Sequence, residues 1–152
     1  MQKRGNKSGQ FYFVAAVILI AILIGFSSIV NYSKKRTTTK ISDIREELKI
    51  ESEKILDYET YTRDSKIENF TKDYSDYVGE DIEIYFITGT NPGIEAYKYE
   101  GDQRININPT ITGNKINVPL YGLNYEFNLK PGKNFYFILS QDINGENHVL
   151  TG

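Results

Sequence analysis

The chain opens with one long apolar stretch and continues with shorter, patterned segments. Residues 11–30 are twenty consecutive uncharged positions, and thirteen of them are Phe, Val, Ile or Leu. As a helix this stretch would rise about 30 Å at ~1.5 Å per residue, which is the thickness of a bilayer's hydrocarbon core. The pattern predicts a transmembrane helix over residues 11–32. We expect it to be retained as an anchor, because the small residues of a signal-peptide cleavage site do not follow it.

A polar, basic segment at residues 33–40 comes next. We interpret it as a juxtamembrane linker near lipid headgroups, with a frayed continuation of the membrane helix as the alternative. After it, apolar residues recur at helical spacing and form a narrow stripe of Ile41, Ile44, Leu48 and Ile55. Such a stripe is typical of a helix packed on its own domain, with a short coiled coil or stalk as the alternative.

A second helix is predicted from Ser65 to Val78. Ser65 and Glu68 have the spacing of a capping box, and Gly79 follows where a C-cap is expected. The helix carries an aromatic-rich stripe of Ile67, Phe70, Tyr74 and Tyr77, which we expect in the core. The pattern leaves open whether residues 58–64 break the helix or bend it.

After Gly79 the period changes from 3.6 to 2, which indicates β-strands. Seven short strands are predicted at residues 81–88, 93–100, 104–108, 115–120, 124–130, 134–140 and 148–151. The turn residues 130–133 predict a hairpin between the fifth and sixth of these strands, and Asn144-Gly145 predicts another before the last. Four tyrosines are expected opposite the core stripe, either exposed or in a second buried face: Tyr85, Tyr97, Tyr99 and Tyr136.

Together these elements predict an α+β fold: a single N-terminal transmembrane helix, then a helical segment packed on a small antiparallel β-sheet or sandwich. Residues 1–10 would be a basic cytoplasmic leader. Residues 41–152 would be the α+β domain, with helices in 41–78 and strands in 81–152. Because the 72 residues of the strand region contain no cysteine, they need the helical stripe to complete a core.

Composition then excludes several classes of function. The chain has no cysteine, one histidine (His148) and a formal net charge of −2. These values exclude thiol catalysis, disulfides, thiolate or histidine metal clusters and the basic field of a nucleic-acid-binding protein. One acidic group stands out: Asp73, Asp76, Glu80, Asp81 and Glu83. We interpret it as a solvated surface, with weak calcium binding as the next alternative, and we expect no enzyme activity, no cofactor and no metal.

Charge also bears on orientation. Three basic residues precede the apolar stretch and four follow it, which is close to a balance under the positive-inside rule. All acidic residues follow residue 42, so residues 37–152 carry 12 basic against 20 acidic side chains. We expect a cytoplasmic N-terminus and an extracytoplasmic C-terminal domain in a single-pass protein of the cell membrane. Asn69, in the triplet Asn-Phe-Thr, is a candidate glycosylation site.

The segment KSGQFYFVAAVILIAILIG resembles the class III signal of type IV pilin-like proteins, and its basic-Gly-Gln-aromatic start is similar to archaeal versions. The resemblance covers about the first 30 residues. It implies that a membrane peptidase cuts between Gly9 and Gln10 and that the retained helix packs into a filament core. Many pilins carry Glu at the fifth mature position, where this chain has Val14. Four small residues would let such helices approach closely: Ala15, Ala16, Ala21 and Gly25.

The sequence therefore predicts a membrane-anchored, non-enzymatic surface protein, either a plain signal-anchored protein or a pilin-like structural subunit. Its expected partners are the lipid bilayer and, through the apolar helix, copies of itself or other pilin-like subunits, with no nucleic acid. The alternative is a bitopic binding or accessory module of a membrane complex that recognises a protein or a glycan.

Overall fold

The computed structural model describes residues 7–62, 66–143 and 145–152, and within its first helix it describes the side chains of residues 12–27 and 40–62. The chain divides into two compact units, residues 1–39 and 40–152, which are taken separately. The second unit begins one residue before position 41, where the sequence predicts the start of the α+β domain. Its helices and antiparallel sheets confirm the α+β class.

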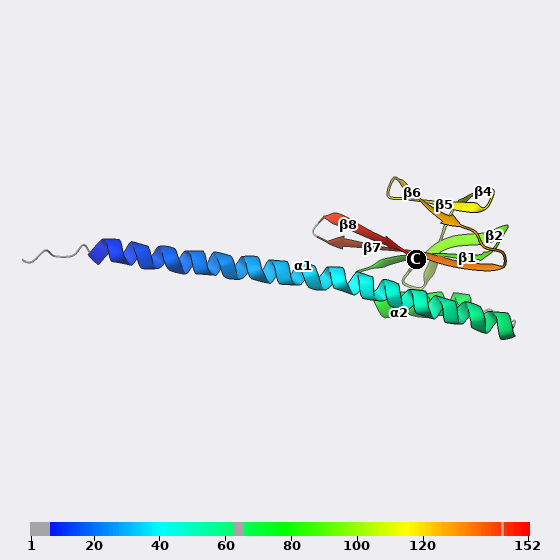
Figure 1. Ribbon diagram of the computed structural model, residues 1–152, viewed down its shortest axis with the longest axis horizontal. Helices are drawn as coiled ribbons and strands as arrows, with labels where there is room; N and C mark the ends of the chain where they lie inside the picture. The colour runs from blue at the N-terminus through cyan, green and yellow to red at the C-terminus, as the bar shows by residue number, and fades with distance from the viewer. Residues whose placement is uncertain (1–6, 63–65, 144) are drawn as a thin grey trace, which may run out of the picture. The chain divides into compact units, whose positions relative to one another are not determined.

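Helix α1 (Lys7–Thr62) is 56 residues long (Figure 1). The backbone of residues 33–40 lies inside this helix, so the helical alternative to a linker is the one observed there. The large apolar side chains from Tyr12 to Phe26 are all exposed, by 50% at Val17 and up to 73% at Tyr12. The transmembrane prediction concerns residues 11–32, of which only part has described side chains, and it stays a prediction.

Across the residues with described placement, no helix combines the length and the apolar character needed to cross a membrane.

The second unit is built on a five-stranded antiparallel sheet in the order β3-β2-β1-β7-β8 (Figure 1). Its strands are β1 (Glu83–Thr90), β2 (Gly93–Glu100), β3 (Gln103–Ile107), β7 (Lys133–Ile143) and β8 (Glu146–Thr151). A smaller antiparallel sheet contains β4 (Thr110–Thr112), β5 (Lys115–Leu120) and β6 (Leu123–Asn128). The C-terminal part of α1 and helix α2 (Ile67–Val78) cover one face of the large sheet, and the small sheet covers the other.

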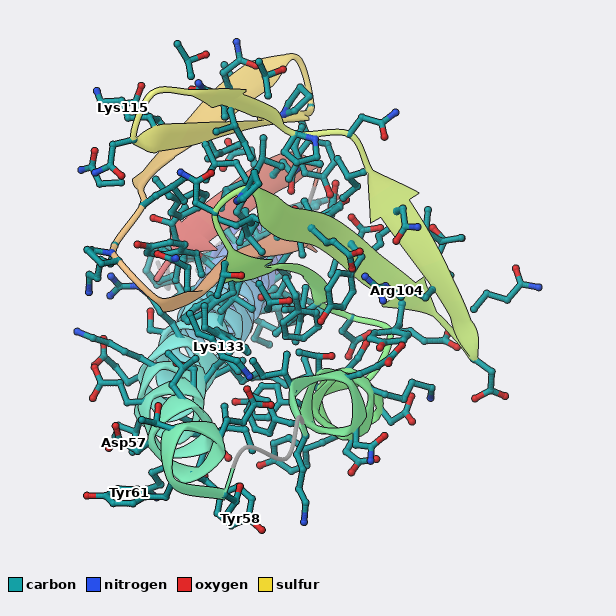
Figure 2. The ribbon with its side chains drawn as sticks, turned by 90° about the vertical axis from the view of Figure 1, so that its right-hand side faces the viewer. Asp57, Tyr58, Tyr61, Arg104, Lys115 and Lys133 are labelled. Atoms are coloured by element: carbon teal, nitrogen blue, oxygen red, sulfur yellow. The ribbon has the colours of Figure 1, made fainter. Side chains whose placement is uncertain are left out.

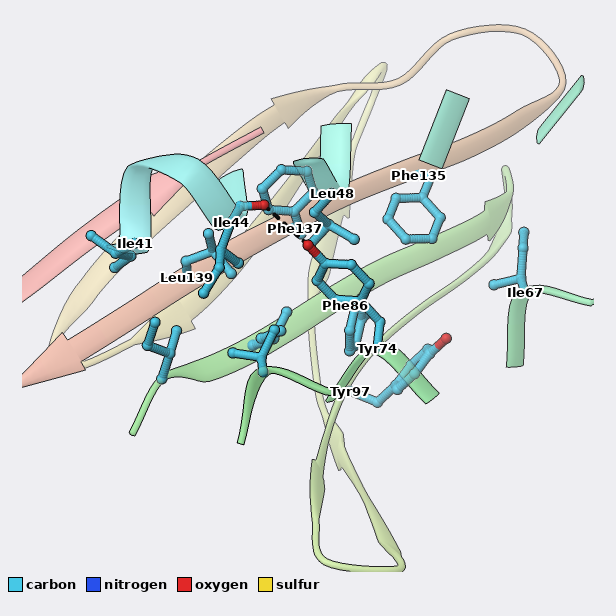
Figure 3. Packing of buried hydrophobic residues seen from close by; sticks show 13 residues of the cluster. Ile41, Ile44, Leu48, Ile67, Tyr74, Phe86, Tyr97, Phe135, Phe137 and Leu139 are labelled. Atoms are coloured by element: carbon cyan, nitrogen blue, oxygen red, sulfur yellow. Dashed lines mark hydrogen bonds between the residues drawn. The ribbon is translucent and has the colours of Figure 1, made fainter. Parts of the chain in front are cut away.

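The apolar stripe of α1 is buried on the large sheet, as Figure 3 shows. Ile41 and Leu48 are at most 1% exposed and belong to one core cluster with Phe86 of β1 and Phe137 of β7. This burial confirms that residues 41–55 pack on their own domain rather than in a coiled coil. Burying a side chain of this size stabilises the fold by about 1.5–3 kcal/mol, which explains why the stripe packs on the sheet.

Helix α2 buries a slightly different face from the predicted one. Ile67 and Tyr74 are buried as expected, but Tyr77 is 68% exposed, and Thr71 and Val78 occupy core positions instead. The prediction for Tyr77 was wrong because the buried positions advance by four, three and four residues around the helix. Tyr77 is not one of these buried positions, and its side chain faces solvent.

All seven predicted strands are present, with shifts of a few residues at their ends. The short strand β4 was not predicted, because three residues are too few to establish a period of 2; all three are exposed in the structure.

The turn at residues 130–133 does not form the predicted hairpin. Among the described strands, β6 pairs with β5, whereas β7 pairs with β1 and β8. The turn instead carries the chain from the small sheet to the large one. Asn134 holds it: its Oδ1 accepts the Lys130 N–H at 2.8 Å, and its Nδ2 donates to the carbonyls of Lys130 at 3.1 Å and Gly132 at 3.0 Å. Turn residues reverse the chain, but they do not choose the strand that it joins next.

The last hairpin agrees with its prediction. Strands β7 and β8 pair in register, with Ile143 opposite Glu146, and Gly145 has a positive φ of 81°. A positive φ is the conformation for which glycine is favoured in such a turn. Asn144, the other residue of the predicted turn, lies outside the described residues.

The four tyrosines divide between the two faces of the large sheet. Tyr85 and Tyr136 lie on the side of the small sheet, which fits the second buried face. The prediction was wrong for Tyr97 and Tyr99, which lie on the helix-covered face. The reason is the register of the first hairpin, where Phe86 of β1 stands opposite Tyr97. Residues directly opposite in a sheet point to the same face.

Candidate functional site

A cleft of about 270 Å³ opens in the second unit, between the start of α2 and the β1–β2 turn. We call it the Arg104 cleft. Its lining residues are Ile67 and Glu68 of α2, Thr88, Gly89 and Thr90 of β1, Gly93, Glu95 and Tyr97 of β2, Arg104 of β3 and Lys133 of β7. Its volume is slightly below the ~300–1,000 Å³ of typical ligand pockets. The cleft therefore has room for one small ligand.

Two glycines shape the floor of the Arg104 cleft. Strand alternation puts Gly93 on the same face as Glu95 and Tyr97. A Cβ at Gly93 would lie 3.5 Å from the Thr90 carbonyl oxygen, an ordinary contact, so the missing side chain leaves space. Gly89 has a φ of 129°, and a Cβ there would lie 2.4 Å from the Gly93 carbonyl oxygen. The backbone thus requires glycine at position 89, whereas at position 93 glycine keeps the floor open.

Arg104 forms the α2 side of the cleft (Figure 2). Its Nη1 lies 3.5 Å from Glu68 Oε1, and its Nη2 donates to Glu95 Oε2. The guanidinium carbon lies 3.9 Å from the centre of the Tyr97 ring, a cation–π contact. Burial disfavours the charged form, but the hydrogen bond and charge of Glu95 outweigh burial and raise the pKa of Arg104. Within the described part of the chain, the buried Nε–H has no hydrogen-bond partner.

A chain of hydroxyl groups holds Tyr97 in place beneath Arg104. The Tyr97 hydroxyl lies 3.2 Å from Thr71 Oγ1 and 3.4 Å from Thr88 Oγ1. Burial raises the pKa of Tyr97, and the two threonine hydrogen bonds offset only part of that increase. Tyr97 is therefore a neutral, fixed ring that supports the guanidinium of Arg104.

Lys133 lies at the α1 side of the cleft (Figure 2) and donates to Glu59 Oε2. The Glu59 side chain is completely buried, and its Oε1 accepts the N–H of Lys66 at 2.6 Å and of Ile67 at 3.0 Å. Burial raises the pKa of Glu59, but the hydrogen bonds from Lys133, Ile67 and Lys66 together outweigh it, so the pKa lies below its ordinary value. One carboxylate thus ties α1 to the start of α2 and to β7.

This arrangement corrects the predicted capping box. Lys66 occupies the N-cap position without a side-chain cap, and Glu59 accepts the N–H groups that need an acceptor. Ser65 lies outside the described residues, and the Glu68 carboxylate turns toward Arg104. A residue on the preceding helix can replace a local cap, because the first N–H groups of a helix accept any well-placed oxygen.

A second polar cluster joins the two sheets. Glu83 Oε2 accepts the hydroxyls of Tyr85, at 2.7 Å, and of Tyr121, and Lys98 Nζ lies 3.2 Å from Glu83 Oε1. Tyr121 has a φ of 52°, which is unusual for a bulky residue. Its contacts with Glu83 and Tyr85 reach from the β5–β6 turn to the large sheet, so we assign this cluster a structural role.

The acidic group singled out in the sequence is dispersed. Asp76 pairs with Lys72, Asp81 lies 3.9 Å from Lys40, and Glu83 belongs to the cluster between the sheets. In the described ranges, no three His, Asp or Glu side chains come close enough to share a metal ion.

Asn69 is exposed on α2, but the glycosylation triplet is only partly accessible in the fold. Thr71, its third residue, is 0% exposed, and its Oγ1 donates to the Glu68 carbonyl at 3.0 Å. A transferase that reads the whole triplet would have to act before α2 packs on the sheet.

The N-terminal candidates all lie in α1. Only the backbone is described at Gly9 and Gln10. Ala15, Ala16, Ala21 and Gly25 are exposed, and Gly25 has no neighbouring atom within 4 Å of an added Cβ. Ala21 and Gly25 are four residues apart and therefore share one face of the helix, at the small-x-x-x-small spacing that permits close helix packing.

The sequence did not reveal the Arg104 cleft, because its lining residues come from α2 and four strands. The nearest local indication is the pair of glycines around the β1–β2 turn. No protein-family model matches the chain, and comparison with curated proteins and with solved structures finds no match.

Proposed function

We propose that the chain is a membrane-anchored, non-enzymatic surface protein that serves as a pilin-like structural subunit. The observation that carries this proposal is the exposed apolar surface of α1. Eleven large apolar side chains between Tyr12 and Phe26 are each at least 50% exposed. The largest apolar patch of an ordinary soluble monomer is about 300–600 Å². An apolar surface larger than such a patch needs lipid or other apolar helices around it.

The continuity of α1 supports the structural part of the proposal. The helix that carries the exposed apolar residues also supplies Ile41, Ile44 and Leu48 to the core of the second unit. The second unit cannot complete its core without this helix. Such a shared helix suits a subunit that associates through its apolar segment and displays the α+β unit outside the membrane. In this proposal a peptidase removes the basic leader between Gly9 and Gln10.

Membrane association is tested by washing broken cells at alkaline pH and measuring where the chain is recovered. We expect it in the membrane pellet. Recovery of the intact chain in the soluble fraction overturns the anchor and, with it, the surface role.

Processing and assembly are tested on the washed membranes. We expect an intact mass and N-terminal sequence that begin at Gln10, and filaments visible by electron microscopy. Gly9→Leu abolishes both, while Gly5→Leu, the same change elsewhere in the leader, preserves both. A chain that begins at Met1 and stays monomeric in mild detergent retains the anchor but overturns the pilin-like role.

Association through the small-residue face has its own test. Gly25→Leu adds a bulky side chain where Ala21 and Gly25 share a face, so filament yield falls, whereas Ile24→Leu leaves it unchanged. Equal yields for the two variants contradict packing through this face.

A second candidate function is a binding module that recognises a protein or a glycan, and the Arg104 cleft favours it. A mild-detergent pull-down of the full chain would retain a partner. Gly93→Val fills the floor of the cleft, and the variant would release that partner. Thr110→Val, at an exposed position of β4, is the matched control and retains the partner. A partner held equally by both variants would place recognition outside the cleft.

A further inference from the structure

We propose that the Arg104 cleft binds a small, neutral ligand rich in hydroxyl groups, of the chemical type of a single sugar unit. The inference deepens the second candidate function above and rests on it. It does not depend on membrane anchoring or on filament formation.

The charges around the cleft are already matched in pairs. The Arg104 guanidinium faces the carboxylates of Glu68 and Glu95, and Lys133 faces Glu59. An anionic ligand would meet the two carboxylates beside Arg104, and a cationic ligand would meet the guanidinium. Either one would have to break an existing pair, and at Lys133 that would leave the buried Glu59 carboxylate unpaired, which is costly. A neutral ligand leaves these pairs intact.

The same groups still have both hydrogen-bond acceptors and hydrogen-bond donors to offer a ligand. Glu68 and Glu95 are 72% and 66% exposed, and each directs only one oxygen to Arg104. Their other oxygens are acceptors, while the Lys133 ammonium keeps donors beyond the one given to Glu59. A hydroxyl group both donates and accepts, so adjacent hydroxyls on one ring match alternating carboxylates and cationic donors.

The remaining lining disfavours an apolar ligand. Ile67 is the one aliphatic side chain among the lining residues, and the Tyr97 ring is covered by Arg104. Gly93 exposes backbone at the floor and lets a ring approach it closely. A volume of about 270 Å³ suits a single ring.

The test is saturation-transfer difference NMR on the full chain in lipid nanodiscs, because sugar-based detergents would compete for the cleft. The neutral probes are the methyl glycosides of glucose, galactose and mannose, and N-acetylglucosamine. Glucuronic acid and glucosamine are their charged counterparts. We expect saturation transfer to at least one neutral probe, with both charged probes bound more weakly.

Two variants connect the binding to the cleft. Gly93→Val fills the floor and abolishes saturation transfer. Arg104→Lys keeps the charge but loses the planar guanidinium over Tyr97, and it weakens binding. Thr110→Val is the matched control and binds as the wild type does. If Gly93→Val fails to fold by circular dichroism, Gly93→Ala and Arg104→Lys decide the question.

Three results would overturn the inference: no saturation transfer to any neutral probe, stronger binding of a charged probe, or binding that neither cleft variant changes. Failure of the inference alone leaves the parent function standing. A protein partner that is released by Gly93→Val, without any sugar binding, keeps the binding module and removes the sugar ligand.

Discussion

Replacing Glu59 by alanine tests whether one buried carboxylate holds α2 against α1. The variant removes the acceptor of two N–H groups, those of Lys66 at 2.6 Å and Ile67 at 3.0 Å. Loss of a helix cap costs about 0.5–2 kcal/mol, and a buried N–H left without a partner costs about 1–3 kcal/mol. The two estimates describe overlapping contacts, so we expect Glu59→Ala to lower the free energy of unfolding by about 2–3 kcal/mol.

Glu59→Gln separates the cap from the ion pair. Glutamine keeps a carbonyl oxygen for the N–H groups, but it replaces the charged Oε2 that accepts from Lys133 with an amide NH2 that only donates. Because the Lys133 side chain is 41% exposed, its ammonium returns to water at small cost, and we expect a loss of about 1 kcal/mol or less. Urea unfolding of the full chain in nanodiscs, followed by the near-ultraviolet circular dichroism of its tyrosines, measures both variants. Hydrogen exchange of the amides at positions 66 and 67 gives the local readout.

Acidification supplies an independent check. The pKa of Glu59 in the folded protein lies below its ordinary value of 4.5. Between these two pKa values the unfolded chain binds more protons, so the stabilisation by Glu59 is complete above about pH 4.5 and is lost as the pH falls through the folded-state pKa. The stability difference between wild type and Glu59→Gln should therefore shrink on acidification. A loss below 0.5 kcal/mol for Glu59→Ala, or equal losses for the two variants, would refute the capping argument.

Five further substitutions test the core, the floor of the cleft and the link between the sheets. Leu48→Ala should lower the free energy of unfolding by about 2–5 kcal/mol, because Leu48 is 0% exposed. Ile50→Ala, on the exposed side of α1, should change the urea midpoint little. Equal effects of the two substitutions would contradict the face of α1 that we assign to the core. Gly89→Ala should lower the free energy of unfolding by about 1–3 kcal/mol through backbone strain. Gly93→Ala should fold with nearly wild-type stability. Similar melting temperatures for these two variants would count against the geometry of the turn. Tyr121→Phe should cost about 1 kcal/mol through its lost hydroxyl, and unchanged urea unfolding would show that this hydroxyl does not stabilise the contact between the sheets.

Local periodicity was sufficient to locate most elements of the second unit. The alternation of apolar residues placed seven strands, and the stripe through Ile41 and Leu48 identified the buried face of α1. These predictions succeeded because burial of one face demands a period of 3.6 or 2 whatever the partner is. They failed where the partner decides the outcome, as in the exposure of Tyr77 and the sides chosen by Tyr97 and Tyr99.

The candidate site shows the same division. Nothing near Glu59 in the sequence marks it as the cap of a helix that begins eight residues later, and nothing near Arg104 links it to Glu68 on α2. Each of these pairs depends on how the helices and strands come together. The Arg104 cleft likewise exists because Gly93 leaves a gap at a place where α2 and four strands converge.

The amino-acid sequence by itself determined the apolar N-terminal segment, the helical and strand periods and the α+β class. These properties follow from spacing, length and residue chemistry, which act over a few turns of helix or one strand. The tertiary structure alone decided that residues 130–133 join two sheets, that Glu59 caps α2 and that a charge-balanced cleft forms around Arg104. Such features depend on contacts between residues far apart in the chain. A local sequence pattern carries no information about which of these contacts form.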